Sequence, residues 1–256
     1  GTPTLVFKDT GGNGVFTSTN TYKYVLYSFS SVADIRLEGG TYSGIGNAKS
    51  VGSLLADGYA YKNSESGEWV TDVSGNTISN VTVAQAPIDM MSASVTEADN
   101  TVHYYMSIDK AITAAQSMSG STVTLLKGIT SESDIQITSG TFTIDLNGQI
   151  LNFSTNRQVG ISGTANITFK DGGSGGKIIN TGIWPTVYIN PGVTVHFEGG
   201  TYESGSAASI KNMSGTIADL LADGYAYQNS DNSWVTDMSG NAISNVTVRA
   251  IPVKIT

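Results

Sequence analysis

The stretch Leu54-Leu55-Ala56-Asp57-Gly58-Tyr59-Ala60-Tyr61 occurs a second time, without a change, from Leu220 to Tyr227. Each copy lies within a longer match, which aligns residues 1–88 with residues 163–253. The offset between the copies varies from 160 to 166 residues, which indicates short insertions and deletions in the surface loops between matched blocks. The chain therefore contains one structural unit twice.

The repeat predicts the domain organisation. Residues 92–162 have no counterpart in the first copy, so the second copy is the longer of the two. We expect residues 1–88 to be the C-terminal half of a first module, residues 89–100 to be a linker and residues 101–256 to be a complete second module. No signal peptide is apparent and Gly1 falls inside the repeat, so we expect the natural protein to begin upstream.

Composition limits the classes of protein and partner. Charged residues make up 13% of the chain, against about 25% in an average soluble domain. No apolar run approaches the roughly 18 residues that would span a bilayer, so no membrane insertion is expected. A net charge of −8 without clusters of Lys and Arg argues against nucleic acid as a partner. Cysteine is absent, which excludes disulfides, thiolate zinc sites and thiol nucleophiles.

Short segments of alternating apolar and polar residues recur along the chain, at residues 33–38, 142–146 and 193–198. A period of two predicts strands with one buried and one solvated face. Leu126, Leu146, Phe169 and Phe197 follow one another at intervals of 20, 23 and 28 residues, and such a recurrence is typical of a solenoid of stacked β coils. A β-sandwich is the alternative, because it also uses short strands and Gly-rich turns.

Residues 107–116 interrupt the β pattern. Ser107 is a suitable N-cap, Asp109 lies in the first turn, and apolar residues at 108, 111, 112 and 115 share one face. These features predict an amphipathic helix. We expect the helix to cover the open end of the second module, where it would hide the apolar interior and an unpaired strand edge.

The other end of each copy is expected to carry a cap. Residues 219–224 predict a short helical turn that ends at a glycine. After this turn, residues 225–227 and 234–235 predict a hairpin, and residues 246–248 predict a third strand beside it.

The order of these segments resembles a known kind of module. The expected helix is followed by Val-Thr-Leu-Leu at 123–126, by Thr-Ile-Asp-Leu-Asn-Gly at 143–148, by Gly-Gly-Thr-Tyr at 199–202 and by the repeated block at 220–227. This order resembles the right-handed parallel β-helix modules, of pectate-lyase-like fold, in large surface proteins of Gram-positive bacteria. The resemblance covers residues 100–253 and the second half of the first copy. It implies an all-β, right-handed parallel β-helix and an adhesin-like role.

The same fold carries pectate lyases and polygalacturonases, so paired carboxylates are relevant. Glycoside hydrolysis needs two carboxylates facing one cleft, and the repeat supplies Asp9 with Asp171 and Glu38 with Glu198 at matched positions. A structural role explains both pairs more simply, because each residue precedes a Gly-rich turn. The sequence lacks the Asn-Thr-Asp, Asp-Asp, Gly-His-Gly and Arg-Ile-Lys motifs of polygalacturonases, so no catalytic residue is predicted.

No metal or cofactor site is predicted. His103 and His196 are the only histidines, and position 196 is Arg36 in the other copy, which favours a generic outward polar site. The Gly-rich loop at 172–176 lacks the lysine of a P-loop and the regular aspartates of calcium-binding β-rolls. It therefore predicts a turn between coils.

Aromatic residues divide into two groups. The cap aromatics recur as a set, so we predict that they pack: Tyr59, Tyr61, Trp69, Tyr225, Tyr227 and Trp234. Tyr22 and Trp184 instead align with each other inside loops that otherwise diverge. A ring on such a loop, on a surface of low charge, is suited to stacking on a sugar. Tyr22 and Trp184 are therefore predicted glycan-binding residues, with packing onto the coil below as the alternative.

These observations favour an extracellular or cell-surface bacterial protein that is not an enzyme. We expect it to bind glycans or host surfaces, or to act as a spacer. An active or degenerate polysaccharide lyase or glycoside hydrolase is the first alternative, and a purely structural stalk is the second.

Overall fold

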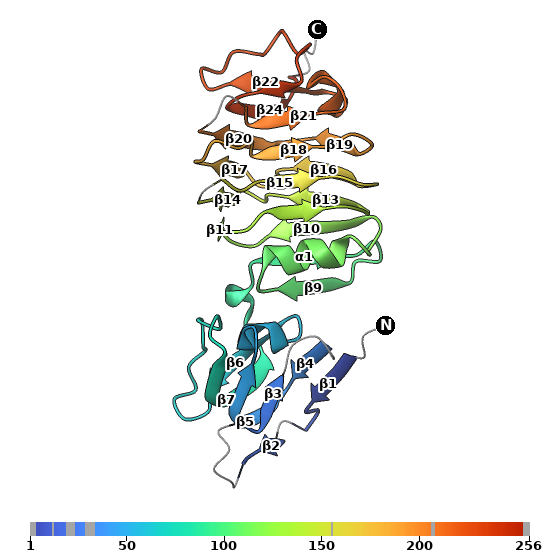
Figure 1. Cartoon of the computed structure of the whole chain (residues 1–256). Coiled ribbons are helices and arrows are strands. Elements are labelled where there is room, and N and C mark those ends of the chain that lie inside the picture. Colours follow the sequence, from blue (N-terminus) through green and yellow to red (C-terminus); the bar gives the residue numbers. More distant parts are fainter. Residues whose placement is uncertain are drawn as a thin grey trace. The chain divides into compact units, whose positions relative to one another are not determined.

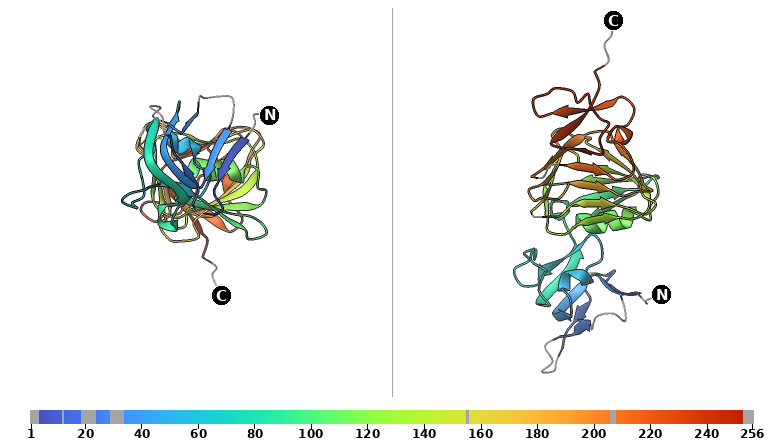
Figure 2. Two further views of the ribbon diagram at one scale, coloured as in Figure 1. Left: turned by 90° about the horizontal axis from the view of Figure 1, so that it is seen from below. Right: turned by 45° about the horizontal axis from the view of Figure 1, so that its top comes forward.

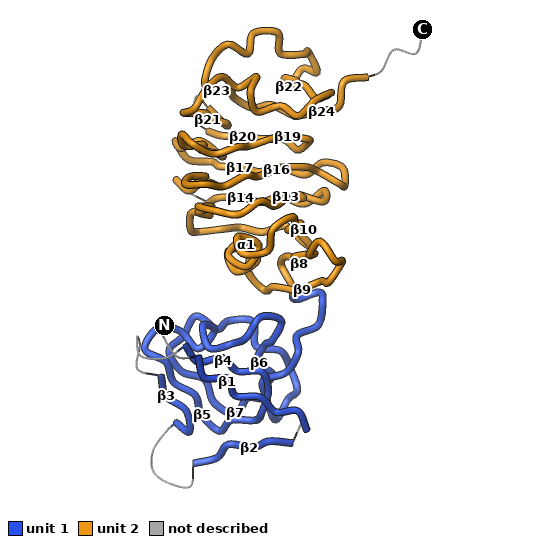
Figure 3. The backbone as a smooth tube through the Cα atoms, turned by 90° about the vertical axis from the view of Figure 1, so that its right-hand side faces the viewer, with its two compact units in different colours: residues 1–90 blue, residues 91–256 orange. Residues whose placement is uncertain are grey.

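A computed structural model describes residues 4–11, 13–18, 24–28, 34–154, 156–205 and 208–252. The chain divides into two compact units, unit 1 (Gly1–Met90) and unit 2 (Met91–Thr256), which Figure 3 distinguishes by colour. Within these residues the fold is all-β with one α-helix, and stacked parallel strands form a right-handed β-solenoid of about 7 turns. The predicted fold class is therefore confirmed.

Unit 2 is a stack of coils, each of which contributes one strand to each of three sheets (Figure 1). The first sheet contains β10 (Ser121–Leu125), β13 (Thr141–Asp145), β16 (Asn166–Lys170) and β19 (Thr194–Phe197). The second contains β11 (Ile129–Ser131), β14 (Ile150–Phe153), β17 (Lys177–Asn180) and β20 (Gly200–Ser204). The third contains β12 (Ile135–Ile137), β15 (Val159–Ile161), β18 (Val187–Ile189) and β21 (Ile210–Asn212). Within each set of four, successive strands pair in parallel.

The interior of unit 2 is a continuous apolar core. As expected, Ile144, Leu146, Phe169 and Phe197 point inward and are buried. The rings of Phe169 and Phe197 stack with centroids 5.2 Å apart, which fills the space between two successive coils.

Two of the three intervals expected between equivalent residues of successive coils are wrong. Val123, Ile144, Phe169 and Phe197 are register partners, at intervals of 21, 25 and 28 residues. Leu125, and not Leu126, is the fully buried leucine of the first coil. Either of two adjacent leucines could be the inward residue of a period-two pattern, and only the pairing between coils shows that Leu125 is.

The predicted helix is confirmed at the first end of unit 2. Helix α1 (Ile108–Ala115) buries its residues 108, 111, 112 and 115 and contacts strands β8, β9, β10 and β12. Ser107 occupies the N-cap position but makes no side-chain cap hydrogen bond, contrary to expectation. Figure 2 shows α1 against the end of the stack of coils.

Two antiparallel strands accompany α1. Strand β8 (Ala93–Thr96) pairs with β10 and with β9 (Val102–Tyr105). Strand β8 lies within the segment 89–100, which the sequence suggested as a linker, and three of its four residues are buried. A signal for this strand was present, because Met91, Ala93 and Val95 alternate with polar residues.

The other end of unit 2 carries the expected cap, except that residues 234–235 form no strand and meet residues 225–229 only through an isolated bridge between Gln228 and Trp234. After the 3-10 turn η3 (Ala218–Leu220), β22 (Tyr225–Asn229) pairs antiparallel with β24 (Val246–Ala250), which itself pairs antiparallel with β20. Strand β23 (Ala242–Ile243) pairs with β21. The buried Tyr227 hydroxyl donates a hydrogen bond to the Ile217 carbonyl at 3.1 Å, so its predicted packing role is confirmed.

Unit 1 repeats the last coils and the cap of unit 2. Strand β1 (Thr4–Lys8) pairs in parallel with β4 (Asp34–Glu38), and β2 (Val15–Phe16) and β3 (Leu26–Ser28) pair in parallel with β5 (Gly40–Asn47). The cap consists of η1 (Val51–Leu54), β6 (Tyr59–Asn63) and β7 (Thr77–Gln85), where β7 is antiparallel to both β5 and β6. The turn η2 (Ile88–Met90) follows. The Tyr61 hydroxyl bonds the Val51 carbonyl as Tyr227 does in unit 2.

Candidate functional site

Asp9 and Asp171 both stabilise loops. The two carboxylate oxygens of Asp171 accept hydrogen bonds from the backbone N–H groups of Gly148, at 2.7 Å, and Gly176, at 2.8 Å. Those of Asp9 accept from Gly11, at 3.0 Å, and Gly14, at 2.7 Å. The Gly-rich loop after Asp171 is thus a turn, but it connects β16 to β17 within one coil and does not join two coils as expected. Its Gly173 and Ser174 lie against Asn147 and Gly148 of the preceding coil.

Glu38 and Glu198 occupy the solvated side of the corner before a Gly-Gly pair. Glu38 lies 3.4 Å from the Lys8 ammonium group. Glu198 is half-buried, and its backbone N–H bonds the Phe169 carbonyl of the preceding coil. The corner requires glycine, because φ of Gly200 is +93° and a Cβ there would lie 2.7 Å from Leu146 Cδ1.

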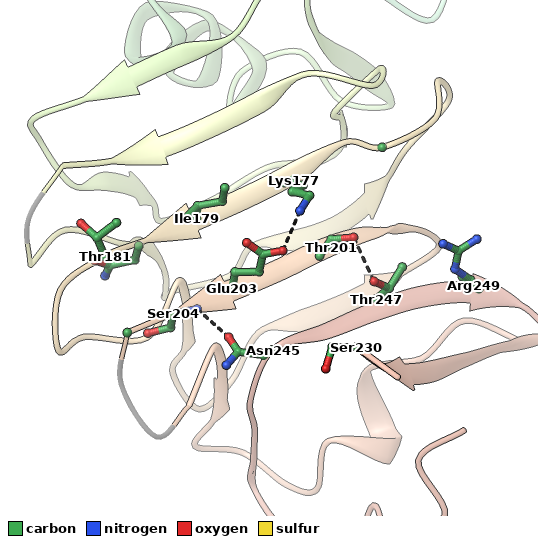
Figure 4. Close-up of a pocket in the computed structure, with 13 residues that line it drawn as sticks. Lys177, Ile179, Thr181, Thr201, Glu203, Ser204, Ser230, Asn245, Thr247 and Arg249 are labelled. Carbon is green, nitrogen blue, oxygen red and sulfur yellow. Dashed lines mark hydrogen bonds and ion pairs between the residues drawn. The ribbon is translucent and has the colours of Figure 1, made fainter. Parts of the chain in front are cut away.

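Two adjoining grooves lie on the outer face of the second sheet, at the cap end of unit 2. Their volumes are about 830 and 670 Å³. They share Gly175, Thr201, Thr247 and Arg249, so they form one continuous surface, which we name the cap groove. Figure 4 shows the part of the cap groove over β17, β20 and β24.

The cap groove follows a row of outward side chains that crosses the strands. Register pairs link Lys177 to Thr201, Thr201 to Thr247 and Thr247 to Gln228, and an isolated bridge links Gln228 to Trp234. Because neighbouring strands lie about 4.8 Å apart, the five residues span about 19 Å. The row runs across the strands and therefore along the stacking direction of the coils.

The row changes character from one end to the other. At one end the Lys177 ammonium group and Glu203 form an ion pair of 2.7 Å. In the middle the hydroxyls of Thr201 and Thr247 are 3.0 Å apart. At the far end Trp234 is 39% exposed and Tyr225 is half-buried beside it in the groove lining. The arrangement offers an apolar ring, hydroxyl and amide groups, one ion pair, and the charged side chains of Arg249 and Glu198.

The loop that carries Trp234 is held by its own hydrogen bonds. Asp231 Oδ1 accepts from the Ser233 hydroxyl at 2.6 Å and from the Ser233 N–H at 2.9 Å. These bonds lower the pKa of the Asp231 carboxyl below its usual value. Beneath the corner, burial raises the pKa of the Tyr202 phenol well above its usual range, with smaller contributions from Tyr227 and Asp171.

Trp234 is the groove residue that the sequence assigned to packing. Its exposure contradicts that assignment, although Tyr61 and Tyr227 of the same set are buried as expected. The sequence contained a signal for the exposure of Trp234. Gln228 follows the buried Tyr227 on an alternating strand and therefore faces outward, and its partner across the expected hairpin must face outward as well.

The structure describes one of the two predicted glycan-binding aromatics, Trp184. Trp184 is 41% exposed on the connection between β17 and β18, and its carbonyl accepts hydrogen bonds from Asn180 Nδ2 and Ser204 Oγ, each at 3.0 Å. The backbone of this loop is therefore held while the indole is accessible. Trp184 does not belong to the lining of the cap groove. Tyr22 lies outside the described residues.

The histidines lie apart from the groove. His103 on β9 lies 2.7 Å from Glu97 Oε1, and His196 is half-buried on the outward face of β19. Among the residues that the structure describes, no three His, Cys, Asp or Glu side chains gather where they could hold a metal ion.

The sequence matches no protein-family model, and neither curated proteins nor solved structures show a significant similarity to it. Within the described ranges, no helix has both the length and the apolar character needed to cross a bilayer. The chemistry of the cap groove is therefore the main guide to function.

Proposed function

We propose that this protein is a non-catalytic, adhesin-like module that binds a glycan chain in the cap groove of unit 2. The exposed indole of Trp234 at the end of a row of hydroxyl and amide groups is the observation that carries the proposal. A sugar ring has an apolar face and a polar rim, so it needs a flat apolar surface and hydrogen-bond partners beside it. The glycan would lie across the strands, parallel to the stacking direction.

The charges of the groove suit a ligand of low charge. Lys177 is already paired with Glu203, and both oxygens of Asp171 accept backbone N–H groups. The two other charged lining residues, Arg249 and Glu198, have opposite signs. Hydrogen bonds to neutral hydroxyls therefore provide the specificity. The Thr201 and Thr247 hydroxyls bond each other and the Gln228 amide donates to the Asn232 carbonyl, and each retains a further lone pair or N–H for a ligand.

Hydrolysis or lyase activity is the alternative function. Glycoside hydrolysis uses two carboxylates on one cleft, and Asp171, Glu198 and Glu203 all line the cap groove. The hydrogen bonds of Asp171 and the ion pair of Glu203 favour binding over catalysis, because both groups already have structural partners. Release of reducing ends from acidic polysaccharides, lost on Glu198→Gln, would establish the enzyme instead.

The resemblance to β-helix modules of Gram-positive surface proteins supports a location outside the cell. A solenoid also separates its two ends by a stack of coils, so a spacer role is compatible with binding at the groove. A purely structural stalk would bind no glycan at all.

A glycan array with the whole chain tests the proposal. We expect binding to a neutral glycan, and we expect Trp234→Ala to weaken it by about 2 kcal/mol or more, as for an aromatic anchor at an interface. Thr194→Ala, an exposed residue on β19, is the control and should leave binding unchanged. Absence of binding to every neutral and acidic glycan would leave the stalk as the remaining function.

A further inference from the structure

Unit 1 carries the same row of outward side chains. Val15 pairs with Thr41, Thr41 with Thr82 and Thr82 with Lys62, and an isolated bridge links Lys62 to Trp69. The hydroxyls of Thr41 and Thr82 are 2.9 Å apart, as those of Thr201 and Thr247 are in unit 2. Unit 1 therefore has the polar middle and the terminal indole of the cap groove.

The neighbour of the indole differs between the units. In unit 1 the Lys62 ammonium group lies over the Trp69 ring, 5.5 Å from its centroid. In unit 2 the matched residue is Gln228, an uncharged side chain without the long alkyl stem of lysine. Both indoles are partly accessible, since Trp69 is half-buried and Trp234 is 39% exposed, so the neighbouring side chain is the feature that distinguishes them.

A lysine in this position competes with a ligand for the same surface. An ammonium group within about 6 Å of an indole centroid is attracted to the ring face by the electrostatic field of the π system. A sugar that stacks on the same face must displace the lysine and lose that attraction. Glutamine carries no charge to place over the ring, so Trp234 is not subject to this competition.

We infer that unit 1 carries a second glycan site that Lys62 masks by occupying the face of Trp69. The inference rests on the proposed function, because it takes the cap groove as the open form of the same site. Lys62 and Gln228 then determine which unit binds, and a single exchange at either position changes the number of sites.

Titration calorimetry measures that number. The probes are neutral hexasaccharides of glucose, mannose and N-acetylglucosamine, and the one that the wild-type chain binds most tightly is used throughout. We expect one site in the wild type, two in Lys62→Gln and a loss of affinity of about tenfold, or about 1.4 kcal/mol, in Gln228→Lys. Lys49→Gln, an exchange of the same type elsewhere in unit 1, is the control and should keep one site.

Fluorescence quenching tests, without any sugar, whether Lys62 covers the face of the Trp69 ring. The chain has three tryptophans, so Trp184→Phe with Trp234→Phe leaves Trp69 as the only one, and its emission is excited selectively at the red edge of the tyrosine absorption. Adding Lys62→Gln to this background should raise the acrylamide quenching constant. With Trp69→Phe and Trp184→Phe, Trp234 is the remaining tryptophan. Adding Gln228→Lys to that background should lower the acrylamide quenching constant. Circular dichroism verifies that each variant remains folded.

The two experiments separate the possible failures. Three results would contradict the inference that Lys62 covers the Trp69 ring. They are unchanged quenching in both backgrounds, two sites in the wild type, or a single site in Lys62→Gln when the wild type binds normally. If quenching changes as expected but no variant binds a hexasaccharide, Lys62 does cover the Trp69 ring. The glycan function and the second site are then both refuted.

Discussion

Asp145 and Asp171 exchange hydrogen bonds between two successive coils. Asp145 Oδ1 accepts from the N–H of Gly172 at 2.7 Å, in the loop after Asp171, and Asp171 Oδ1 accepts from the N–H of Gly148 at 2.7 Å, in the loop after Asp145. Each carboxylate thus binds the other's loop. The relationship fixes the spacing of the two loops independently of the apolar core.

Loss of either carboxylate should destabilise unit 2. Asp171→Ala leaves the backbone N–H groups of Gly148 and Gly176 without their acceptor, and we expect a loss of about 2–4 kcal/mol in the free energy of unfolding. Asp145→Ala should have a similar effect, and the double variant should lose less than the sum. Urea unfolding with a double-mutant cycle measures the coupling. Asp223→Ala, an exposed carboxylate, is the control, and strict additivity would show that the two bonds act independently.

Truncation of a stacked core ring should be equally costly. Phe197 is fully buried and stacks on Phe169, so Phe197→Ala should lower the free energy of unfolding by about 3–5 kcal/mol. Thr194→Ala lies on the outward face of the same strand and should change it by less than about 0.5 kcal/mol. A melting temperature that is unaffected by Phe197→Ala would contradict the register of the inner face.

The cap role of α1 is testable with matched substitutions. Ile112→Asp places a carboxylate against the buried end of the stack, and we expect loss of folding and aggregation, visible by light scattering. Thr113→Asp changes an exposed position of the same helix and should leave the protein monomeric. Complete deletion of the helix should also cause aggregation. A soluble, monomeric deletion variant would show that the end needs no cover.

Alkaline pH should destabilise the protein through its buried tyrosines. Burial raises the pKa of Tyr42 to about 12 and raises that of Tyr202 above its usual range, so the folded state retains these protons longer than the unfolded state. Their stabilising contribution is fully present below the ordinary value of 10.0 and is lost as the pH rises through the folded pKa.

Tyr202→Phe isolates this effect. The variant should be less stable at pH 7 by about 1 kcal/mol, because the Gly199 carbonyl loses the hydroxyl donor. Its stability should then decline less steeply than that of the wild type above pH 10. Chemical unfolding at a series of pH values provides both numbers, and parallel curves would assign alkaline unfolding to other groups.

The sugar-stacking prediction for Tyr22 and Trp184 remains separate from the cap groove. Replacement of both residues by alanine should abolish glycan binding if these loops carry it, and should shift the free energy of unfolding by less than about 0.5 kcal/mol. Trp234→Ala in the same assay distinguishes the groove from the loops. A loss of stability on Trp184→Ala would instead identify that ring as a packing anchor.

Local and repeated patterns account for the parts of the fold that were predictable. The period of two places Phe169 and Phe197 inside, and the spacing of apolar residues predicts α1, since both depend on neighbours in sequence. The alignment of Leu125 with the next coil depends on loop lengths, which a single chain does not reveal. The bond between Asp145 and Gly172 depends on them too, because 27 residues separate the partners.

The candidate site was less predictable than the fold. Trp69 and Trp234 are matched residues of one repeat, but the residue across the strand is Lys62 in unit 1 and Gln228 in unit 2. Only the pairing of the strands places these residues beside the indoles. The character of this surface therefore depends on pairings between strands.

The antiparallel direction of β24 and β22 has a mechanical consequence. A parallel coil can accept another coil on its edge indefinitely, but β24 reverses the chain on β20 and ends the parallel ladder. Strand β7 does the same on β5 in unit 1. Each module therefore terminates its own sheet. A chain built in this way can be lengthened by whole modules through gene duplication, and under tension it would yield in separate steps while the remaining modules keep bearing the load.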